Sequence, residues 1–333
     1  MGIKKIAINN FTVFREMELD VCSGINVFIG INGTGKTHLL KGIYAICEAL
    51  DKGSDFVENY ISRDYFEVNP IALARSIDLH NLPWMKVLFH DSSYGEYKIN
   101  MHKGLKLAAD GFNYHKSGAS SSYVFIPSKD ILTHASGFMS LYDNVKVSFD
   151  KSYYNIVSRA LLPQLRETSP IASEVAPLLK NMINGEIQIE HDSFFVYSDD
   201  GKKTAFAVEA EGFKKMGLLW QLLMNGSINS GTILLWDEPE ANINPIHLPA
   251  LVDVLLALQR HGVQLFLATH NYFFAKYVEA KMTDEDAVLF HSLYHAEDGV
   301  QCESSERFSL LENNPIIAES VNLYKAEIKK VVA

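Results

Sequence analysis

The chain has 333 residues, of which 47% are hydrophobic, and a formal net charge of −10. This length fits one large α/β domain with an inserted lobe, or two domains, and the apolar content excludes an intrinsically disordered chain. The negative charge argues against a surface that attracts nucleic acid as a whole, although it is compatible with a local basic patch.

Cysteine spacing and hydropathy indicate the cellular compartment. The chain contains Cys22, Cys47 and Cys302, which are far apart in the sequence. This spacing favours a reducing environment and argues against a pair of metal-binding cysteines. No apolar stretch reaches the length of a membrane span, and the apolar run at the N-terminus is too short for a secretory signal. We therefore expect a cytoplasmic protein that makes no membrane contact.

The first part of the chain predicts strands around one helix. Apolar patterning predicts strands at 3–8, 17–21, 24–29, 84–90, 96–101 and 123–126. Helical spacing follows the third of these strands, at 38–50. Residues 51–83 are polar and interrupted, and the stretch 111–122 is rich in Gly, Ser and Asn, so we expect a loop there.

The second part alternates between helices and strands. Helical spacing predicts helices at 153–166, 171–182, 212–224, 248–260 and 315–332. Strands are predicted in a small meander at 185–189, 193–197 and 203–208, and as apolar runs at 232–236, 264–268 and 287–293. Because buried strands alternate with helices, we expect a mostly parallel sheet that is covered on both faces.

The segment 30–37 fits the phosphate-binding pattern G-x-x-x-x-G-K-[ST] at each fixed position, between a predicted strand and a predicted helix. Its glycines let backbone N–H groups surround a phosphate, and the helix N-terminus adds positive potential. Lys36 is placed to reach the β- and γ-phosphates, and Thr37 to ligate Mg²⁺. The nucleotide-binding residues expected here are Gly30, Asn32, Gly33, Thr34, Gly35, Lys36, Thr37 and His38.

Two further apolar strands end in polar residues. Asp237 follows the strand at 232–236 and is expected to hold Mg²⁺ together with Thr37. Glu238 can orient or deprotonate an attacking water. His270 follows the strand at 264–268, at the same end of the sheet, where it can contact the γ-phosphate. The alternative is a pair of strands that simply end in solvated polar residues.

Taken together, these segments resemble the ABC-type ATPase heads of the RecF, SMC and OLD (overcoming lysogenisation defect) kind. The resemblance covers most of the chain and includes a D-loop-like stretch at 241–245. Segment 209–215 resembles the signature, which implies that Gly212 and Lys214, or Lys215, contact ATP held by a second subunit. Ala210 stands where the family usually has serine, and no glutamine marks the Q-loop near 128–130. Both departures imply slow hydrolysis.

The resemblance implies a P-loop NTPase fold of the ABC-head type. Its mostly parallel sheet would be flanked by helices and accompanied by an N-terminal antiparallel β part and an inserted helical lobe. We expect residues 1–130 to form the N-terminal half with the phosphate loop, and 131–208 the lobe with the small meander. Residues 209–333 would form the C-terminal half with the signature, the Walker B acids and the switch histidine.

The implied function is an ATPase that uses ATP and Mg²⁺ and works as a dimerising nucleotide switch for a partner effector or DNA. The stretch after His270 is too short for the Toprim nuclease domain of many OLD proteins. We therefore expect a separate effector, a nuclease or toxin, in bacterial (including antiviral) defence or DNA maintenance.

Other functions stay open at this point. One is an ATP-binding dimerisation module with negligible hydrolysis, and another is the motor subunit of a transporter, against which the large lobe and the atypical signature argue. A third is a RecF-like DNA-binding repair factor. Its basic patch would consist of Lys98, Lys103, Lys106 and Lys116.

Overall fold

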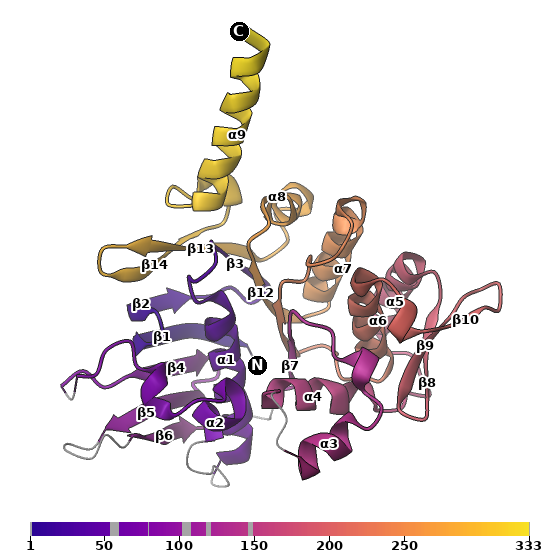
Figure 1. The fold of residues 1–333 in the computed structure, drawn as a ribbon, viewed down its shortest axis with the longest axis horizontal. Coiled ribbons are helices and arrows are strands. Elements are labelled where there is room, and N and C mark those ends of the chain that lie inside the picture. Colours follow the sequence, from indigo (N-terminus) through magenta and orange to yellow (C-terminus); the bar gives the residue numbers. More distant parts are fainter. Residues whose placement is uncertain are drawn as a thin grey trace.

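The fold is that of a computed structural model, in which residues 2–53, 60–78, 80–101, 108–117, 121–145 and 149–332 are described. These residues form three β-sheets with helices packed around them (Figure 1). Lys103, Lys106 and parts of the expected irregular stretches at 51–83 and 111–122 lie outside the described residues.

One sheet is antiparallel, with the strand order β2-β1-β4-β5-β6. Its strands are β1 (Ile3–Phe11), β2 (Phe14–Asp20), β4 (Trp84–Phe89), β5 (Tyr94–Met101) and β6 (Ala108–His115). The last strand shows that the loop expected at 111–122 was wrong in its first half, because β6 continues to His115 and pairs with β5 along its length. Partner strands supply hydrogen bonds that override the low strand propensity of Gly and Asn.

The central sheet has the order β14-β13-β3-β12-β11-β7. Its strands are β3 (Ile25–Ile29), β7 (Tyr123–Ile126), β11 (Ile233–Asp237), β12 (Gln264–Thr269), β13 (Val288–Ala296) and β14 (Gly299–Ser305). All neighbours are parallel except the edge pair of β13 and β14. β3, β11 and β12 are buried at each position. The mostly parallel sheet predicted from the sequence is therefore confirmed.

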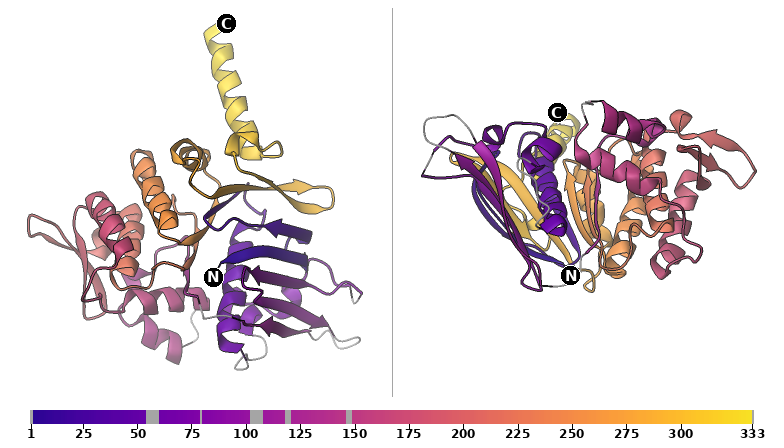
Figure 2. Two further views of the ribbon diagram at one scale, coloured as in Figure 1. Left: turned by 180° about the vertical axis from the view of Figure 1, so that it is seen from behind. Right: turned by 90° about the horizontal axis from the view of Figure 1, so that it is seen from below.

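The helix after the phosphate loop, α1 (Lys36–Lys52), lies between the antiparallel and the central sheet (Figure 2, right). Its buried residues share one apolar core with side chains of β1, β4 and β12, such as Ile6, Met85 and Phe266. This helix cannot tilt without disturbing both sheets, because its packing is continuous on two sides.

The opposite face of the central sheet is covered by helices of a second apolar core. They include α4 (Lys151–Ala160), α5 (Pro170–Ile183), α6 (Glu211–Met224), α7 (Leu248–Arg260) and α8 (Tyr272–Lys281). Ser169 starts α5 by accepting a hydrogen bond from Ala172 N–H at 3.3 Å. The helix expected at 153–166 ends at Ala160 instead, because Pro163 has no N–H to continue it.

The segment 131–208 also contains α3 (Phe138–Asn144) and the third sheet. That sheet has the order β10-β9-β8 and consists of β8 (Glu186–Glu190), β9 (Ser193–Tyr197) and β10 (Lys203–Ala205). A short helix, α2 (Tyr60–Phe66), packs against α1. The sequence did not predict α2, α3, α8 or β14, although Asn271 caps α8 by accepting from Phe274 N–H at 3.0 Å.

The chain ends in α9 (Pro315–Val332), which projects away from the rest of the molecule (Figures 1 and 2). Side chains from residue 321 onward are exposed wherever they are described. Of the helices in the described ranges, none has the length and apolarity that crossing a membrane requires.

Gln264 joins the first strand to the central sheet. Its side-chain amide donates to Ile3 O and to Cys22 O, both at 2.8 Å, and its carbonyl accepts from Ile3 N–H at 2.7 Å. We predict that Gln264→Leu lowers the free energy of unfolding by about 3 kcal/mol, because three main-chain groups lose their partner.

Urea denaturation measures this change. The matched control is Gln188→Leu on the exposed face of β8, which should stay within about 0.5 kcal/mol of the wild type. Equal effects of the two substitutions would contradict the role given to Gln264.

Candidate functional site

The phosphate loop connects β3 to α1 in a conformation that needs glycine. Gly33 and Gly35 have φ of 82° and 85°, in the left-handed region. A side chain at Gly30 would place Cβ 2.3 Å from Leu293 O of β13. Thr34 is fully buried, and its hydroxyl donates to Ile31 O at 2.8 Å, so its side chain holds the loop rather than lining it.

Lys36 lies inside this loop. Its Nζ donates to Gly30 O at 2.7 Å and to Ile31 O at 3.0 Å, and the residue is 7% exposed. Burial lowers the pKa of Lys36, whereas the nearby carboxylates of Asp237, Glu238 and Glu240 raise it. The ammonium is thus already directed to the centre of the loop, where a phosphate would be bound.

A cavity of about 370 Å³ opens beside the loop. Its lining consists of Val13, Asn32, Gly33, Gly35, Lys36, Thr37, His38 and Glu238. No atom of the described residues lies within 4 Å of a Cβ built on Gly33, so backbone N–H groups there can be approached closely. The volume is in the range of small-molecule and cofactor sites. The residues present therefore fit a nucleotide phosphate chain.

The two predicted metal ligands meet directly. Thr37 Oγ1 lies 2.9 Å and 3.1 Å from the two carboxylate oxygens of Asp237 and donates to that group. Asp237 is 4% exposed, and burial is the main cause that raises its pKa, opposed by this hydrogen bond. A hydroxyl and a carboxylate are oxygen donors of the kind Mg²⁺ takes, so this pair fits that ion.

The two predicted catalytic residues also meet. His270 Nδ1 lies 3.0 Å from Glu238 Oε1, and both side chains remain partly exposed. They come together because Asp237 of β11 pairs with Ala268 of β12, so the residues after each strand leave the same edge. Glu238 has φ of 50°, and its N–H donates to Ala268 O at 2.9 Å.

Sequence reasoning missed a buried acid in the same turn. Glu240 is 4% exposed, and its Oε1 accepts from Thr269 Oγ1 at 2.6 Å. Its Oε2 has no hydrogen-bond partner among the described residues, and burial raises the pKa of this carboxyl. The only signal in the sequence was the position of Glu240 two residues after Glu238.

The signature-like segment starts α6 and packs on its own chain. Gly212 is buried, and a Cβ there would lie 2.8 Å from Asn242 O. Lys214 pairs with Glu211 at 2.8 Å and approaches Asp130 to 4.0 Å. Lys215 donates through Nζ to the main-chain O of Glu238, just after β11, at 2.7 Å. The sequence did not indicate this contact.

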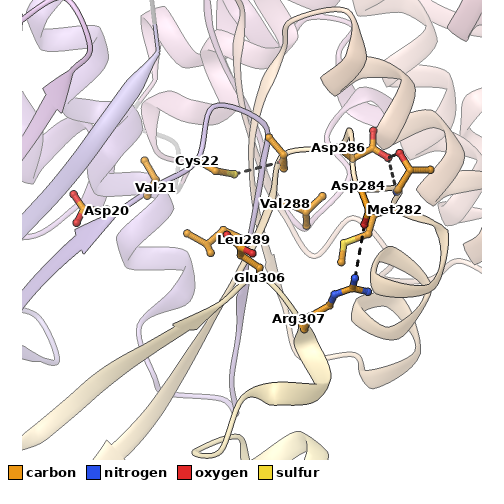
Figure 3. Close-up of a pocket in the computed structure, with 12 residues that line it drawn as sticks. Asp20, Val21, Cys22, Met282, Asp284, Asp286, Val288, Leu289, Glu306 and Arg307 are labelled. Carbon is orange, nitrogen blue, oxygen red and sulfur yellow. Dashed lines mark hydrogen bonds and ion pairs between the residues drawn. The ribbon is translucent and has the colours of Figure 1, made fainter.

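Another cavity, of about 440 Å³, lies where β2 ends and β13 begins (Figure 3). Its charged lining residues are Asp20, Asp284, Asp286, Glu306 and Arg307. None of the residues predicted to bind nucleotide lines it, and its acidic rim suits phosphate poorly. The candidate site is therefore the one beside Lys36.

A family model described as "AAA domain, putative AbiEii toxin, Type IV TA system" matches residues 54–275, which include Asp237, Glu238 and His270. The chain belongs to this AAA-domain family.

Two curated relatives are DNA replication and repair proteins named RecF. That of Cytophaga hutchinsonii is 51% identical over 47 residues, 14% of this chain and 12% of the relative. That of Caldanaerobacter subterraneus subsp. tengcongensis is 30% identical over 113 residues, 32% of this chain and 27% of the relative. The matches thus span only a small part of these relatives' own length.

Solved SMC heads share the fold. One is an SMC head bound to the C-winged helix domain of ScpA, with a TM-score of 0.60 and 10% identity over 92% of this chain and 98% of that one. Another is an SMC head with an extended coiled coil, bound to the C-terminal domain of ScpA from Pyrococcus furiosus. Its TM-score is 0.58, at 10% identity over 98% of this chain and 99% of the other. The expected ABC-head fold is confirmed.

We predict that Lys36→Ala weakens ATP binding by at least about 100-fold, or roughly 2.7 kcal/mol, because it removes the charge directed into the loop. Isothermal titration calorimetry measures the affinity. Lys52→Ala, in the last turn of the same helix, is the matched control and should bind like the wild type. Unchanged affinity of the Lys36 variant would contradict the assignment of the loop.

Proposed function

We propose that this chain binds and hydrolyses ATP and acts as a dimerising nucleotide switch for a partner. The observation that carries the proposal is that two pairs, Thr37 with Asp237 and Glu238 with His270, meet at one sheet edge beside Lys36. This is the arrangement that a metal-assisted phosphoryl transfer to water requires.

Each residue has a role in the proposed reaction. The loop N–H groups and Lys36 bind the β- and γ-phosphates, and Thr37 and Asp237 hold the metal. When bound, Mg²⁺ neutralises charge on the phosphate oxygens. Glu238 orients the attacking water and accepts its proton, and His270 holds the Glu238 carboxylate through the 3.0 Å contact.

The second subunit is proposed to engage the nucleotide through the first turn of α6. Ala210 is exposed at the N-cap position and gives that helix no side-chain cap. The N–H of Phe213 donates to Ala210 O at 2.9 Å, so the N–H groups of the two residues before it are the ones we assign to an anion. Gly212 is already packed on Asn242, so we assign the contact between subunits to the helix start around Ala210 rather than to Gly212.

A separate effector protein, such as a nuclease or toxin, is the partner we favour over DNA. The family's description names a toxin–antitoxin system, and the RecF relatives are DNA repair proteins. Two of the four lysines of the suggested DNA patch are paired with acids: Lys98 with Glu96 at 3.2 Å and Lys116 with Asp51 at 2.8 Å. Such pairing reduces the local positive potential. A role in defence or DNA maintenance follows from this proposal.

An ATP-binding module with negligible hydrolysis is the second candidate, and the serine missing at Ala210 favours it. Both candidates predict ATP-dependent dimers. They differ in whether the wild-type protein turns ATP over at steady state.

We predict that Glu238→Gln keeps ATP affinity within about threefold but slows hydrolysis by roughly 100-fold or more, because the catalytic base is lost. Phosphate release measures turnover, and light scattering with ATP present should show accumulated dimer. The control is Glu285→Gln at an exposed position. Normal turnover in the Glu238 variant would remove this residue from the mechanism.

We predict opposite effects of two substitutions at Ala210. Ser and Asp both cap a helix, so each should stabilise α6 by about 1 kcal/mol. In the ATP-bound dimer, Ala210→Ser should speed hydrolysis because its hydroxyl can donate to the partner's phosphate. Ala210→Asp should prevent ATP-dependent dimers by placing a negative charge against that phosphate. Light scattering and phosphate release measure both effects.

Mixing Lys36→Ala subunits with Ala210→Asp subunits tests the shared site. Each mixed dimer has one site with both defects and one with neither, so activity should reappear on mixing. Normal dimerisation and turnover of Ala210→Asp alone would show that α6 does not face a second nucleotide.

A further inference from the structure

Lys215 makes a contact that the roles above leave unexplained. It lies in the first turns of α6, is 4% exposed, and donates through Nζ to the main-chain O of Glu238 at 2.7 Å. Among the described residues, no carboxylate lies within ion-pair distance of this ammonium. Burying an ammonium group is costly, so a lysine kept here needs a reason beyond packing.

The acceptor of this hydrogen bond belongs to a strained residue. Glu238 has φ of 50°, a left-handed conformation that is unfavourable in a residue other than glycine and persists only where the surroundings hold it. Its N–H is held by Ala268 O at 2.9 Å, and its carbonyl accepts from Ala241 N–H at 3.1 Å and from Lys215. The lysine is thus the side chain that fixes the Glu238 carbonyl.

Gly212 gives a second contact between α6 and the segment that follows β11. It lies three residues before Lys215, on the same face of α6. Gly212 packs on the other end of the turn, where a Cβ would lie 2.8 Å from Asn242 O and 3.1 Å from Ile243 Cα. The first two turns of α6 therefore contact the segment 238–243 near both of its ends.

The acidic residues around Lys215 favour a positive charge at this buried position. Burial lowers the pKa of Lys215, whereas the carboxylates of Glu240, Glu238 and Asp237 raise it, in that order. The Lys215 ammonium thus offsets part of the mutual repulsion of the three acids at the end of β11, without forming an ion pair with any of them among the described residues.

We propose that Lys215 is a positioning residue that holds the Glu238 carboxylate opposite His270 and transmits a displacement of α6 to it. This inference rests on the proposed function, in which Glu238 is the catalytic base and α6 faces the second nucleotide. Because Nζ donates to the Glu238 carbonyl at 2.7 Å, a shift of α6 would act on the backbone of Glu238 through this hydrogen bond. Engagement of a second subunit would in this way set the rate of hydrolysis.

The test compares two buried side chains of one helix. Lys215→Met should lower kcat by about 10- to 100-fold, the cost of a misplaced catalytic group, and leave KM and ATP affinity within about threefold of the wild type. Lys215→Arg should retain more activity than Lys215→Met, because a donor is restored.

Gln221→Met is the matched control. Gln221 is fully buried in α6 and donates to Ala160 O and Leu162 O, both at 3.1 Å, far along the helix from Glu238. Both Met variants should lose thermal stability, whereas only Lys215→Met should lose kcat. A kcat of Lys215→Met within threefold of the wild type, or an equal loss in Gln221→Met, would overturn the proposal.

Amide hydrogen exchange without ATP gives a readout that does not depend on hydrolysis. Exchange in the segment 237–243 should be faster in Lys215→Met and unchanged in Gln221→Met. If the wild-type protein shows no turnover, the hydrolytic part of the proposed function fails, and exchange in this segment still decides the role of Lys215. Unchanged exchange in Lys215→Met would then reject it.

Discussion

The parallel register of three buried strands is the constraint on which the site depends. Ile29 of β3 pairs with Thr269 of β12, and Ala268 pairs with Asp237 of β11. The phosphate loop, the two acids and the histidine therefore leave the sheet in one row. In parallel α/β sheets, ligands bind outside the carboxyl ends of strands, and this row lies at that edge. A slip of one residue would turn the strand ends to the other face and separate the pairs.

The site contains several buried ionisable side chains, which apolar packing alone does not explain. Two lysines, Lys36 and Lys215, lie near the acids Asp237 and Glu240, and burial disfavours the charged form of each. Neighbours of opposite charge offset part of this cost. The two apolar cores on either side of the central sheet hold these charged groups in place. Their arrangement fits an anionic ligand that brings a metal ion.

Direct contacts connect α6 to the turn after β11, which bears on how the proposed nucleotide switch would work. The signature-like segment does not stand free at the surface, since Gly212 packs on Asn242 and Lys215 bonds to Glu238. A movement of the helix start therefore has a direct mechanical route to the proposed base. In the proposed switch, this contact within one chain would couple the state of the subunit interface to the geometry of the base.

The sequence by itself determined the features that local patterns specify. The phosphate loop, the acids after an apolar strand and the last helix at 315–332 all follow from residue spacing, because loop, strand and helix signals lie within the segments themselves. The position of His270 at the same sheet edge as Asp237 follows for the same reason, because it comes after an apolar strand of a parallel sheet, whereas its role stays a prediction.

Tertiary structure decided what depends on distant partners. Strand β6 exists because β5 pairs with it, although its composition predicts a loop. The inward side chain of Thr34, the packing of Gly212 and the reach of Lys215 rather than Lys214 to Glu238 all depend on where α6 and the loop lie in space. Local spacing fixes which face of a helix a side chain occupies, but only packing of that helix on the sheet fixes which atom it meets.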